Sequence, residues 1–246
     1  MKSLDNKIII ITGGSGLLGK AMVDNVRIKG GVAINADINN ETDISNGVVN
    51  CDITSEESII GTVNLIEKCF GRIDGLVNNA YPRTDDWGAS FEDIPLKSWK
   101  TNVDWQMNSY FLFCQQVIKS MKKSGGGSII NIASIYGVVG NDFTIYEGTS
   151  IEPPAAYTAI KGGLINFSRF LASKYGVDGI RVNCISPGGI FDNQPEKFVE
   201  AYERKVPIKR MGNPDDIAPV VSFLLSGESG YITGQNIIVD GGWTAI

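Results

Sequence analysis

Short runs of apolar, β-branched residues alternate with longer amphipathic stretches from one end of the chain to the other. Such short runs are typical of strands buried on both faces, and apolar positions three and four residues apart are typical of helices. The pattern predicts strands at 7–11, 31–36, 73–77, 128–133, 180–185 and 237–239, with a short strand ending at 49–52. It predicts helices at 17–29, 55–70, within 96–123, at 155–175 and at 214–225. This alternation implies right-handed βαβ units and a parallel sheet covered on both faces.

A glycine-rich turn joins the first predicted strand to the first predicted helix. Its glycines are Gly13, Gly16 and Gly19. Glycines at such a turn let the backbone approach a pyrophosphate, and the free N–H groups at the helix end attract its charge. The same residues also suit an ordinary strand-to-helix turn, so the glycines alone leave two interpretations open.

Asp37 ends the second predicted strand and favours the nucleotide interpretation. A carboxylate at this place accepts hydrogen bonds from the adenosine ribose and repels a 2′-phosphate, which predicts NAD(H) rather than NADP(H). Aspartate also begins turns well, so a purely structural role at the start of 37–40 remains an alternative.

Tyr157 and Lys161 lie four residues apart in a predicted helix, and therefore on one face of it. An ammonium beside a phenol favours the phenolate and lowers the tyrosine pKa from its usual value of about 10. A shift of roughly 3 units takes about 4 kcal/mol of differential interaction, so a second positive charge is needed, and an oxidised nicotinamide carries one. The pair predicts a tyrosine that exchanges a proton with an alcohol near neutral pH.

The composition excludes several other activities. The chain has no histidine, which removes Ser-His-Asp hydrolysis and most zinc sites, and we expect no metal. The net charge of −5 offers no basic stripe for nucleic acid. No apolar run is long enough for a bilayer, and no signal-peptide pattern follows Lys2. The four cysteines lack a metal-like spacing, so we expect reduced thiols in a cytoplasmic protein with no membrane partner.

With these motifs in this order, the chain resembles the short-chain dehydrogenase/reductase family, in its short single-domain branch, along nearly the whole length. The resemblance implies a Rossmann-like, doubly wound α/β fold with a mainly seven-stranded parallel sheet in one domain, 1–246. About 1–130 would bind the cofactor, and about 131–246 would hold the catalytic residues, a substrate flap and the interface of a homo-oligomer, a tetramer or dimer. The matching segments are Thr12–Gly19, Asp52-Ile53, Asn78-Asn79-Ala80, Asn108, Ser134, Tyr157 with Lys161, Ser186-Pro187-Gly188 and Ile232–Trp243.

The resemblance also implies roles for individual residues. Tyr157 would be the general acid/base, Lys161 would lower its pKa and bind the nicotinamide ribose, and Ser134 would orient the substrate oxygen. Asn108 would hold a water that links Lys161 to solvent. Ser134 also suits a strand-end hydroxyl that satisfies backbone groups, and Asn108 suits a helix cap or kink. The cofactor would contact Gly13, Ser15, Gly16, Leu17, Leu18, Gly19, Asp37, Asp52, Ile53, Asn79, Ala80, Tyr157, Lys161, Pro187, Gly188 and Ile190.

The sequence departs from the family pattern at three places. Leu17 stands where the short branch has its second motif glycine, and the glycine is at Gly16. Tyr81 replaces the usual glycine after Ala80, where its ring is expected to narrow the cofactor groove or line the substrate entrance. Asp192 or Asn193 replaces a threonine that commonly touches the carboxamide of the cofactor.

The substrate side is marked by an unusually long segment between Ser134 and Tyr157. Its added stretch, 141–154, contains Tyr, Glu, Asn and Asp, which suit a hydroxyl-rich ligand because each buried sugar hydroxyl needs a partner. Packing of this loop against a neighbouring subunit is an equal alternative. Arg83, with Lys197 or Arg204, is a candidate for binding a phosphate or carboxylate. Residues 191–209 are expected to form a short mobile flap over the ligand.

These observations favour an NAD-preferring oxidoreductase that interconverts a secondary alcohol and a ketone on a small molecule. The expected substrate is a sugar or sugar-derived acid, including phosphorylated and nucleotide-linked forms, of the kind used in surface glycans. One alternative is a 3-oxoacyl-thioester reductase acting on an acyl-carrier protein. Another, of a different class, is a nucleotide-binding regulator without catalytic activity.

Overall fold

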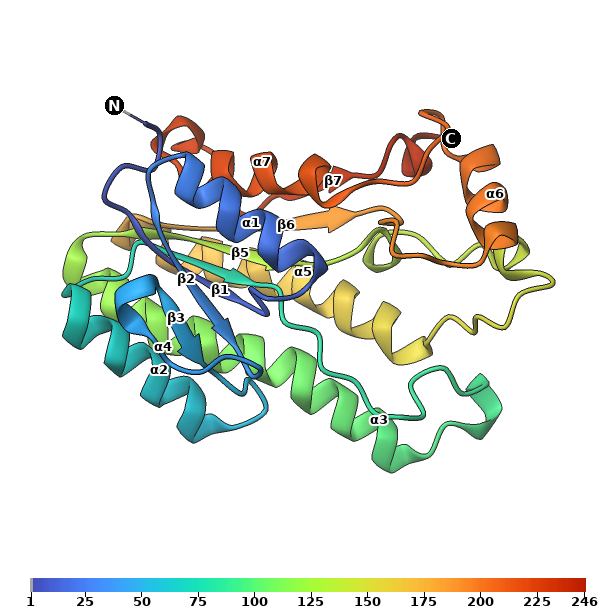
Figure 1. Ribbon diagram of the computed structural model, residues 1–246, viewed down its shortest axis with the longest axis horizontal. Helices are drawn as coiled ribbons and strands as arrows, with labels where there is room; N and C mark the ends of the chain where they lie inside the picture. Colours follow the sequence, from blue (N-terminus) through green and yellow to red (C-terminus); the bar gives the residue numbers. More distant parts are fainter. Residues whose placement is uncertain (1) are drawn as a thin grey trace.

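The computed structural model describes residues 2–246 as a seven-stranded sheet with helices on both faces (Figure 1). The strand order is β3-β2-β1-β4-β5-β6-β7 and every adjacent pair is parallel, which confirms the doubly wound, Rossmann-like sheet in a single domain. The strands are β1 Ile8–Thr12, β2 Val32–Asp37, β3 Val48–Asn50, β4 Gly75–Asn78, β5 Gly127–Ile132, β6 Ile180–Pro187 and β7 Asn236–Val239.

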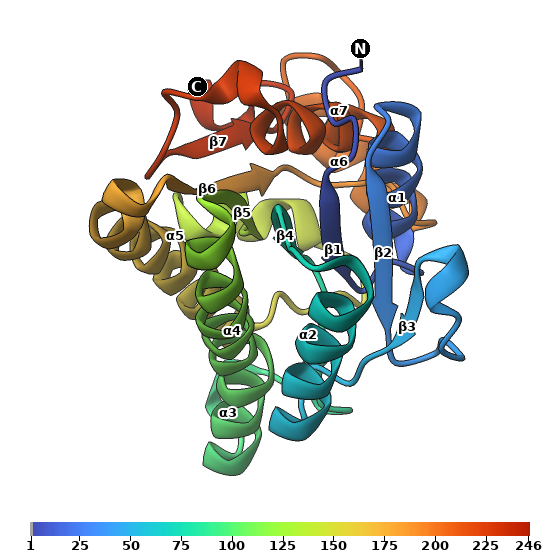
Figure 2. The same cartoon turned by 90° about the vertical axis from the view of Figure 1, so that its left-hand side faces the viewer.

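The helices form two layers. α1 and α7 cover one face of the sheet, and α2, α4 and α5 cover the other (Figure 2). α6 lies beyond the carboxyl end of the sheet, close to the end of the chain (Figure 1). The helices are α1 Leu17–Ile28, α2 Glu56–Phe70, α3 Leu96–Val103, α4 Ser109–Ser124, α5 Ala155–Tyr175, α6 Glu196–Lys205 and α7 Pro214–Leu225.

Most predicted elements are confirmed to within one or two residues, and two differ in an informative way. The single long helix expected within 96–123 is divided, because α3 and α4 are joined by a π-helical turn over Asp104–Asn108. In that turn the Ser109 N–H bonds to the Asp104 carbonyl, one residue further back than in an α-helix. β6 runs to Pro187, two residues beyond the predicted 180–185, and so carries the chain directly into the site.

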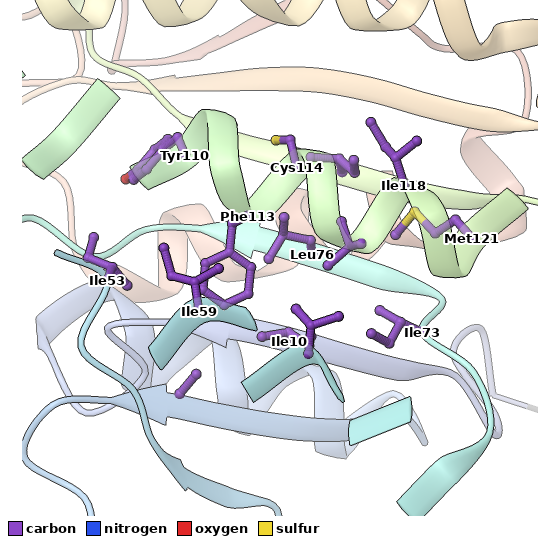
Figure 3. Packing of buried hydrophobic residues seen from close by; sticks show 14 of the residues in the cluster. Ile10, Ile53, Ile59, Ile73, Leu76, Tyr110, Phe113, Cys114, Ile118 and Met121 are labelled. Atoms are coloured by element: carbon purple, nitrogen blue, oxygen red, sulfur yellow. The ribbon is translucent and has the colours of Figure 1, made fainter. Parts of the chain in front are cut away.

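Burial of β1 on both faces explains its continuous run of apolar residues. Successive side chains of a strand point to opposite faces. Ile8 and Ile10 pack into the core under α2, α4 and α5, while Ile9 and Ile11 pack into the core under α1 and α7. Figure 3 shows the first of these cores, with residues of α4 such as Phe113 and Met121 packed close to Leu76 of β4 and Ile10 of β1.

A third, smaller core lies outside the sheet. Ile145 from the long 141–154 loop packs with Phe198 and Tyr202 of α6, and Val206 and Met211 complete the cluster. The loop therefore packs against α6 of its own chain. We call the 141–154 loop, α6 and this cluster the lid.

The strand order places a crevice next to the centre of the sheet. β1 is flanked by β2 and β4, so the connections from β1 and β4 leave on opposite faces and open a gap at their carboxyl ends. Ligands of open α/β sheets bind at such a point. Within residues 2–246, no helix is long and apolar enough to cross a membrane.

Candidate active site

A cavity of about 940 Å³ runs along the carboxyl ends of the strands at this crevice. Its wall comes from the turn after β1, the end of β2, the loops after β4, β5 and β6, and the start of α5. The cavity brings together most of the residues predicted from the sequence. They are Gly13, Gly16, Leu17, Leu18, Asp37, Asp52, Ile53, Asn79, Ala80, Ser134, Tyr157, Lys161, Pro187, Gly188 and Ile190.

The turn after β1 fits a pyrophosphate. Gly13 has φ +63°, and a Cβ on it would lie 2.8 Å from the Ala80 Cα, so no larger residue fits. Gly16 caps α1 without any side-chain hydrogen bond, and the first turn of α1 carries no acid. The N–H groups of that turn are therefore free to bind an anion. Asn79 fixes the turn to β4, because its Nδ2 donates to the carbonyls of Thr12 and Gly13 at 3.0 and 3.2 Å.

Ser15 and Gly19 were predicted to touch the cofactor, but neither forms part of the cavity wall. The Ser15 N–H donates to Asp37 Oδ2 at 3.1 Å, and its hydroxyl bonds to Asn40. Gly19 packs directly against the backbone of Gly13 and Gly14, where a Cβ has no room. Both residues shape the turn, while their neighbours Gly16 and Leu18 line the cavity.

Asp37 borders the cavity and also organises the turn that follows β2. Its side chain is 7% exposed, and its Oδ1 accepts from the Asn39 N–H at 3.0 Å. The structural role is observed, and the same turn leaves the carboxylate bordering the cavity at the end where we expect the adenosine. Asp52 and Ile53 lie at the same end, after β3.

Ser134, Tyr157 and Lys161 lie together at the other end of the cavity. The Lys161 Nζ is 5.4 Å from the centre of the Tyr157 ring and donates to the Ile132 carbonyl at 2.8 Å. Ser134 Oγ accepts from the Tyr136 N–H at 3.2 Å, which leaves its own proton free to donate. These contacts come from β5, the segment after it and α5, which the sheet holds side by side.

Burial controls the charges of this group. It lowers the pKa of Lys161 to about 8. It raises the pKa of Tyr157 above the usual value, while the hydrogen bond with Ser134 opposes that shift. The sequence predicts a lowered tyrosine pKa only with Lys161 and an oxidised nicotinamide acting together. Burial outweighs the Ser134 hydrogen bond, so the pKa of Tyr157 lies above its usual value.

The prediction for Asn108 is wrong in its geometry. Asn108 is exposed, bonds to Asp104 Oδ1 at 2.8 Å, and is absent from the cavity wall. Gln106, two residues earlier in the π-helical turn, is the buried amide on the inner side. Its Nε2 donates to the Pro82 carbonyl at 2.8 Å, and its Oε1 is buried without a partner among residues 2–246.

Tyr81 places a second aromatic ring on Tyr157. Its ring centre lies 5.5 Å from that of Tyr157, edge to face, and 5.7 Å from that of Trp87. The Lys161 Nζ lies 5.6 Å from the Tyr81 ring centre and 5.7 Å from that of Tyr110. Tyr81 lines the cavity, in agreement with its expected place at the groove or substrate entrance.

The remaining wall contains residues that the sequence did not single out. Tyr136 and Tyr146 line the cavity and share a hydrogen bond between their hydroxyls at 3.0 Å. Tyr146 lies within the long loop that the sequence marked, so the loop was the available signal. Asp192 lines the cavity, whereas Asn193, with φ +57°, turns the backbone beside it. Of the cations proposed for the substrate, the cavity wall includes Arg83 but neither Lys197 nor Arg204.

A glycine turn at the crevice of a doubly wound sheet, with a buried tyrosine–lysine pair beside it, defines a nicotinamide-dependent oxidoreductase. Comparison with known proteins agrees. A family model described as enoyl-(acyl carrier protein) reductase matches residues 27–244. The crystal structure of a short-chain dehydrogenase from Leptospira borgpetersenii with bound NAD⁺ superposes with a TM-score of 0.89 at 36% identity, covering 98% of this chain and 94% of that chain.

Two curated relatives cover nearly the whole chain. The post-translational flagellin modification protein A of Campylobacter coli is 36% identical over 98% of this chain and 99% of its own length. The 3-oxoacyl-[acyl-carrier-protein] reductase of Buchnera aphidicola is 32% identical, with 96% of each chain covered. This chain belongs to the short-chain dehydrogenase/reductase family. It is an oxidoreductase acting on alcohol and ketone groups, with a fold that binds NAD(P).

Proposed function

We propose that the protein interconverts a secondary alcohol and a ketone on a sugar or sugar-derived molecule of surface-glycan synthesis, with NAD(H) as the preferred cofactor. One observation carries this proposal. The hydroxyls of Tyr136 and Tyr146, the latter from the long loop, form a polar wall at the end of the cavity where Ser134 and Tyr157 lie. A ligand with several hydroxyls finds partners on such a wall, whereas an aliphatic chain leaves the two phenols with only their mutual hydrogen bond.

Tyr157 is the residue we assign to proton transfer. In the reducing direction its phenol donates a proton to the carbonyl oxygen, and in the oxidising direction the phenolate accepts the proton of the alcohol. Ser134 donates a second hydrogen bond to the same oxygen, since its Oγ already accepts from the Tyr136 N–H. Two donors aimed at the oxygen stabilise the negative charge that develops on it. The bound nicotinamide supplies or accepts the hydride and, when oxidised, carries a positive charge.

Lys161 acts on Tyr157 through charge. Its ammonium is held by the Ile132 carbonyl and by the surrounding tyrosine rings, and is 4% exposed. A cation in so dry a place interacts strongly with a phenolate, because little water screens it. Lys161 also borders the cavity where the nicotinamide ribose is expected.

The cofactor preference rests on Asp37. Its carboxylate is the anionic group at the end of β2 and borders the adenosine end of the cavity. A ribose hydroxyl can donate to it, and a 2′-phosphate is repelled by it. The NAD⁺ in the similar Leptospira structure supports this preference.

The sugar substrate is supported by the likeness to a flagellin modification protein. The second candidate, reduction of a 3-oxoacyl thioester, is supported by the Buchnera relative and by the description of the matching family model. The regulator alternative is disfavoured, because Ser134, Tyr157 and Lys161 lie together at one end of the cavity.

The test is a titration of the purified protein with NADH and NADPH, followed by fluorescence, with and without sugar ketones and 3-oxoacyl thioesters. We expect tighter binding of NADH and its oxidation on a sugar ketone. Oxidation on the thioesters alone would establish the second candidate. Failure to bind either nucleotide would refute the proposal.

We also propose that the protein is a homo-oligomer, a dimer or tetramer. Phe111 of α4 and Phe170 of α5 are 48% and 58% exposed on neighbouring helices, and the ring centre of Phe111 lies 6.3 Å from that of Phe167 of α5, with the rings tilted. Exposed aromatic side chains grouped in this way are typical of interfaces. Light scattering coupled to gel filtration measures the mass directly.

A further inference from the structure

Arg83 is the one arginine in the cavity wall described for residues 2–246, and its guanidinium forms no ion pair or hydrogen bond there. Lys161, the other cation of the wall, already donates to the Ile132 carbonyl and lies over the tyrosine rings. We propose that Arg83 is an anion subsite that binds a carboxylate or phosphate carried by the substrate. This inference rests on the proposed function and specifies its substrate class as an anionic sugar.

The side chain of Arg83 is held in place by the aromatic group around the catalytic tyrosine. Its Cζ lies 5.8 Å from the centre of the Tyr81 ring. Tyr81 in turn packs edge to face on Tyr157 and Trp87. A guanidinium stacked on a ring keeps its N–H groups free at the edge, so it can still bind an anion in the plane. The stack therefore links the anion subsite to the reacting end of the cavity.

The backbone of Arg83 is fixed on both sides by buried amides. The Pro82 carbonyl accepts from Gln106 Nε2 at 2.8 Å, and the Thr84 N–H donates to Asn102 Oδ1 at 3.1 Å. Asn102 and Gln106 are each 2% exposed and lie four residues apart on one face of the α3 helix and its π-helical turn. These two part-buried hydrogen bonds hold the backbone on either side of Arg83. They position Arg83 at the wall.

The other cations of this region lie outside the cavity wall. Arg204 pairs with Glu200 on α6, and Lys205 pairs with Asp142 of the long loop. Lys197 is exposed beside Gly148. The acidic residues of the wall are Asp37 and Asp52 at the adenosine end and Asp192 on the segment after β6. An anion in the cavity is therefore attracted to Arg83 and repelled from Asp37, Asp52 and Asp192.

The wall thus combines two kinds of recognition. Tyr136 and Tyr146 present hydroxyls, and Arg83 presents a planar cation that binds carboxylate or phosphate through two parallel hydrogen bonds. A ligand that uses both is polyhydroxylated and carries one negative group. A neutral sugar can bond to the tyrosine hydroxyls but leaves Arg83 without an anionic partner.

The experiment measures binding of three related sugars to the protein saturated with NADH, by calorimetry. D-glucose is the neutral probe, D-glucuronate carries a carboxylate, and D-glucose 6-phosphate carries a phosphate, so the two anions distinguish the source of the charge. We expect one or both anions to bind at least about 10-fold tighter than glucose. Arg83→Gln should remove that advantage while leaving the glucose and NADH affinities unchanged, and Arg83→Lys should keep part of it. The control is Arg204→Gln, outside the cavity, which should keep all of it.

Three results overturn the subsite. They are no binding or no advantage of either anion in the unaltered protein, an advantage that persists in Arg83→Gln, and a loss of NADH affinity in Arg83→Gln equal to the loss of anion affinity. The last result makes Arg83 a cofactor residue. Failure of the proposed function gives a different result from failure of the subsite. Lack of turnover on every ketone refutes the function, while tighter binding of the anions that depends on Arg83 can still be measured.

Discussion

The ring of Tyr81 packs edge to face on the ring of Tyr157, with their centres 5.5 Å apart and an angle of 76° between their planes. Tyr81 stands where the family commonly has glycine, so this contact is an addition to the usual site. It restricts how the Tyr157 ring can rotate, and it covers one side of the Lys161 ammonium. The acid/base residue is thereby held by packing as well as by its own helix.

Replacement of Tyr81 tests this contact. Tyr81→Ala removes the ring, and because such an aromatic pair contributes about 0.5–1.5 kcal/mol, we expect kcat to fall by up to about 10-fold. Tyr81→Phe keeps the ring and should retain nearly full activity. Steady-state kinetics with NADH binding measured in parallel separates an effect on catalysis from one on the cofactor. Equal losses in both variants would assign the effect to the hydroxyl.

Tyr157→Phe removes the hydroxyl group that transfers the proton. We expect turnover to fall by at least about 100-fold, while the dissociation constant for NADH stays within about 2-fold, because the phenol acts on the substrate. Stopped-flow measurement of hydride transfer gives the turnover, and fluorescence titration gives the dissociation constant for NADH. A variant that lost both to the same extent would show that Tyr157 is structural.

Lys161 makes the stability of the ligand-free protein depend on pH. The folded protein releases the Lys161 proton near pH 8, whereas the unfolded chain keeps it to about 10.5. Between these values the unfolded state binds more protons, so the stability contributed by Lys161 rises with pH and is lost as the pH falls through 8. We expect the unfolding free energy relative to Lys161→Met to increase by about 3 kcal/mol from pH 7 to pH 10. Urea titrations at both pH values measure it, and a constant difference would contradict the buried ammonium.

Gln106 and Asn108 form a matched pair for testing the π-helical turn. Gln106→Ala leaves the part-buried Pro82 carbonyl without its donor, at a cost of about 1 kcal/mol, and should lower Tm by about 2–4 °C. Asn108→Ala acts at an exposed side chain, and we expect Tm and kcat to stay close to those of the unaltered protein. Thermal unfolding and kinetics of both variants decide the matter. A large loss of turnover in Asn108→Ala alone would restore Asn108 as the catalytic residue.

The lid should respond as one unit to a change in its own core. Ile145→Ala opens a cavity between the long loop and α6, and we expect faster amide exchange in both 143–151 and 196–206. Exchange in β1 and β4, which belong to the main cores, should stay unchanged. Mass-spectrometric hydrogen exchange measures all four segments. Faster exchange in the loop alone would show that α6 is held independently.

The sequence predicted the elements of the sheet well because their signals are local and repetitive. β1 and β6 are buried along nearly their whole length, and α5 and α7 match their predicted bounds, 155–175 and 214–225, since periodicity marks them. The nucleotide turn and the tyrosine–lysine pair were predictable for the same reason, because each depends on short spacings that one turn of backbone fixes.

The features that the sequence did not predict depend on which way a residue faces around its helix and on contacts between segments far apart in the chain. Residues two apart on a helix point about 200° apart, so Asn108 faces solvent when Gln106 faces inward. The polar stripe of Ser98, Asn102 and Gln106 at four-residue spacing was the available sign of the buried side. The place of the 141–154 loop has no such periodic signal, and only its packing against α6 shows that it belongs to the lid.

The separate core of the lid has a consequence for how such a protein can change over time. Ile145 and Phe198 pack with one another and not with the two cores that hold the sheet, so mutations among them leave the reaction centre at Ser134 and Lys161 supported. A lineage can therefore alter which molecule it accepts while inheriting its chemistry intact. Divergence into new substrates needs no rebuilding of the scaffold.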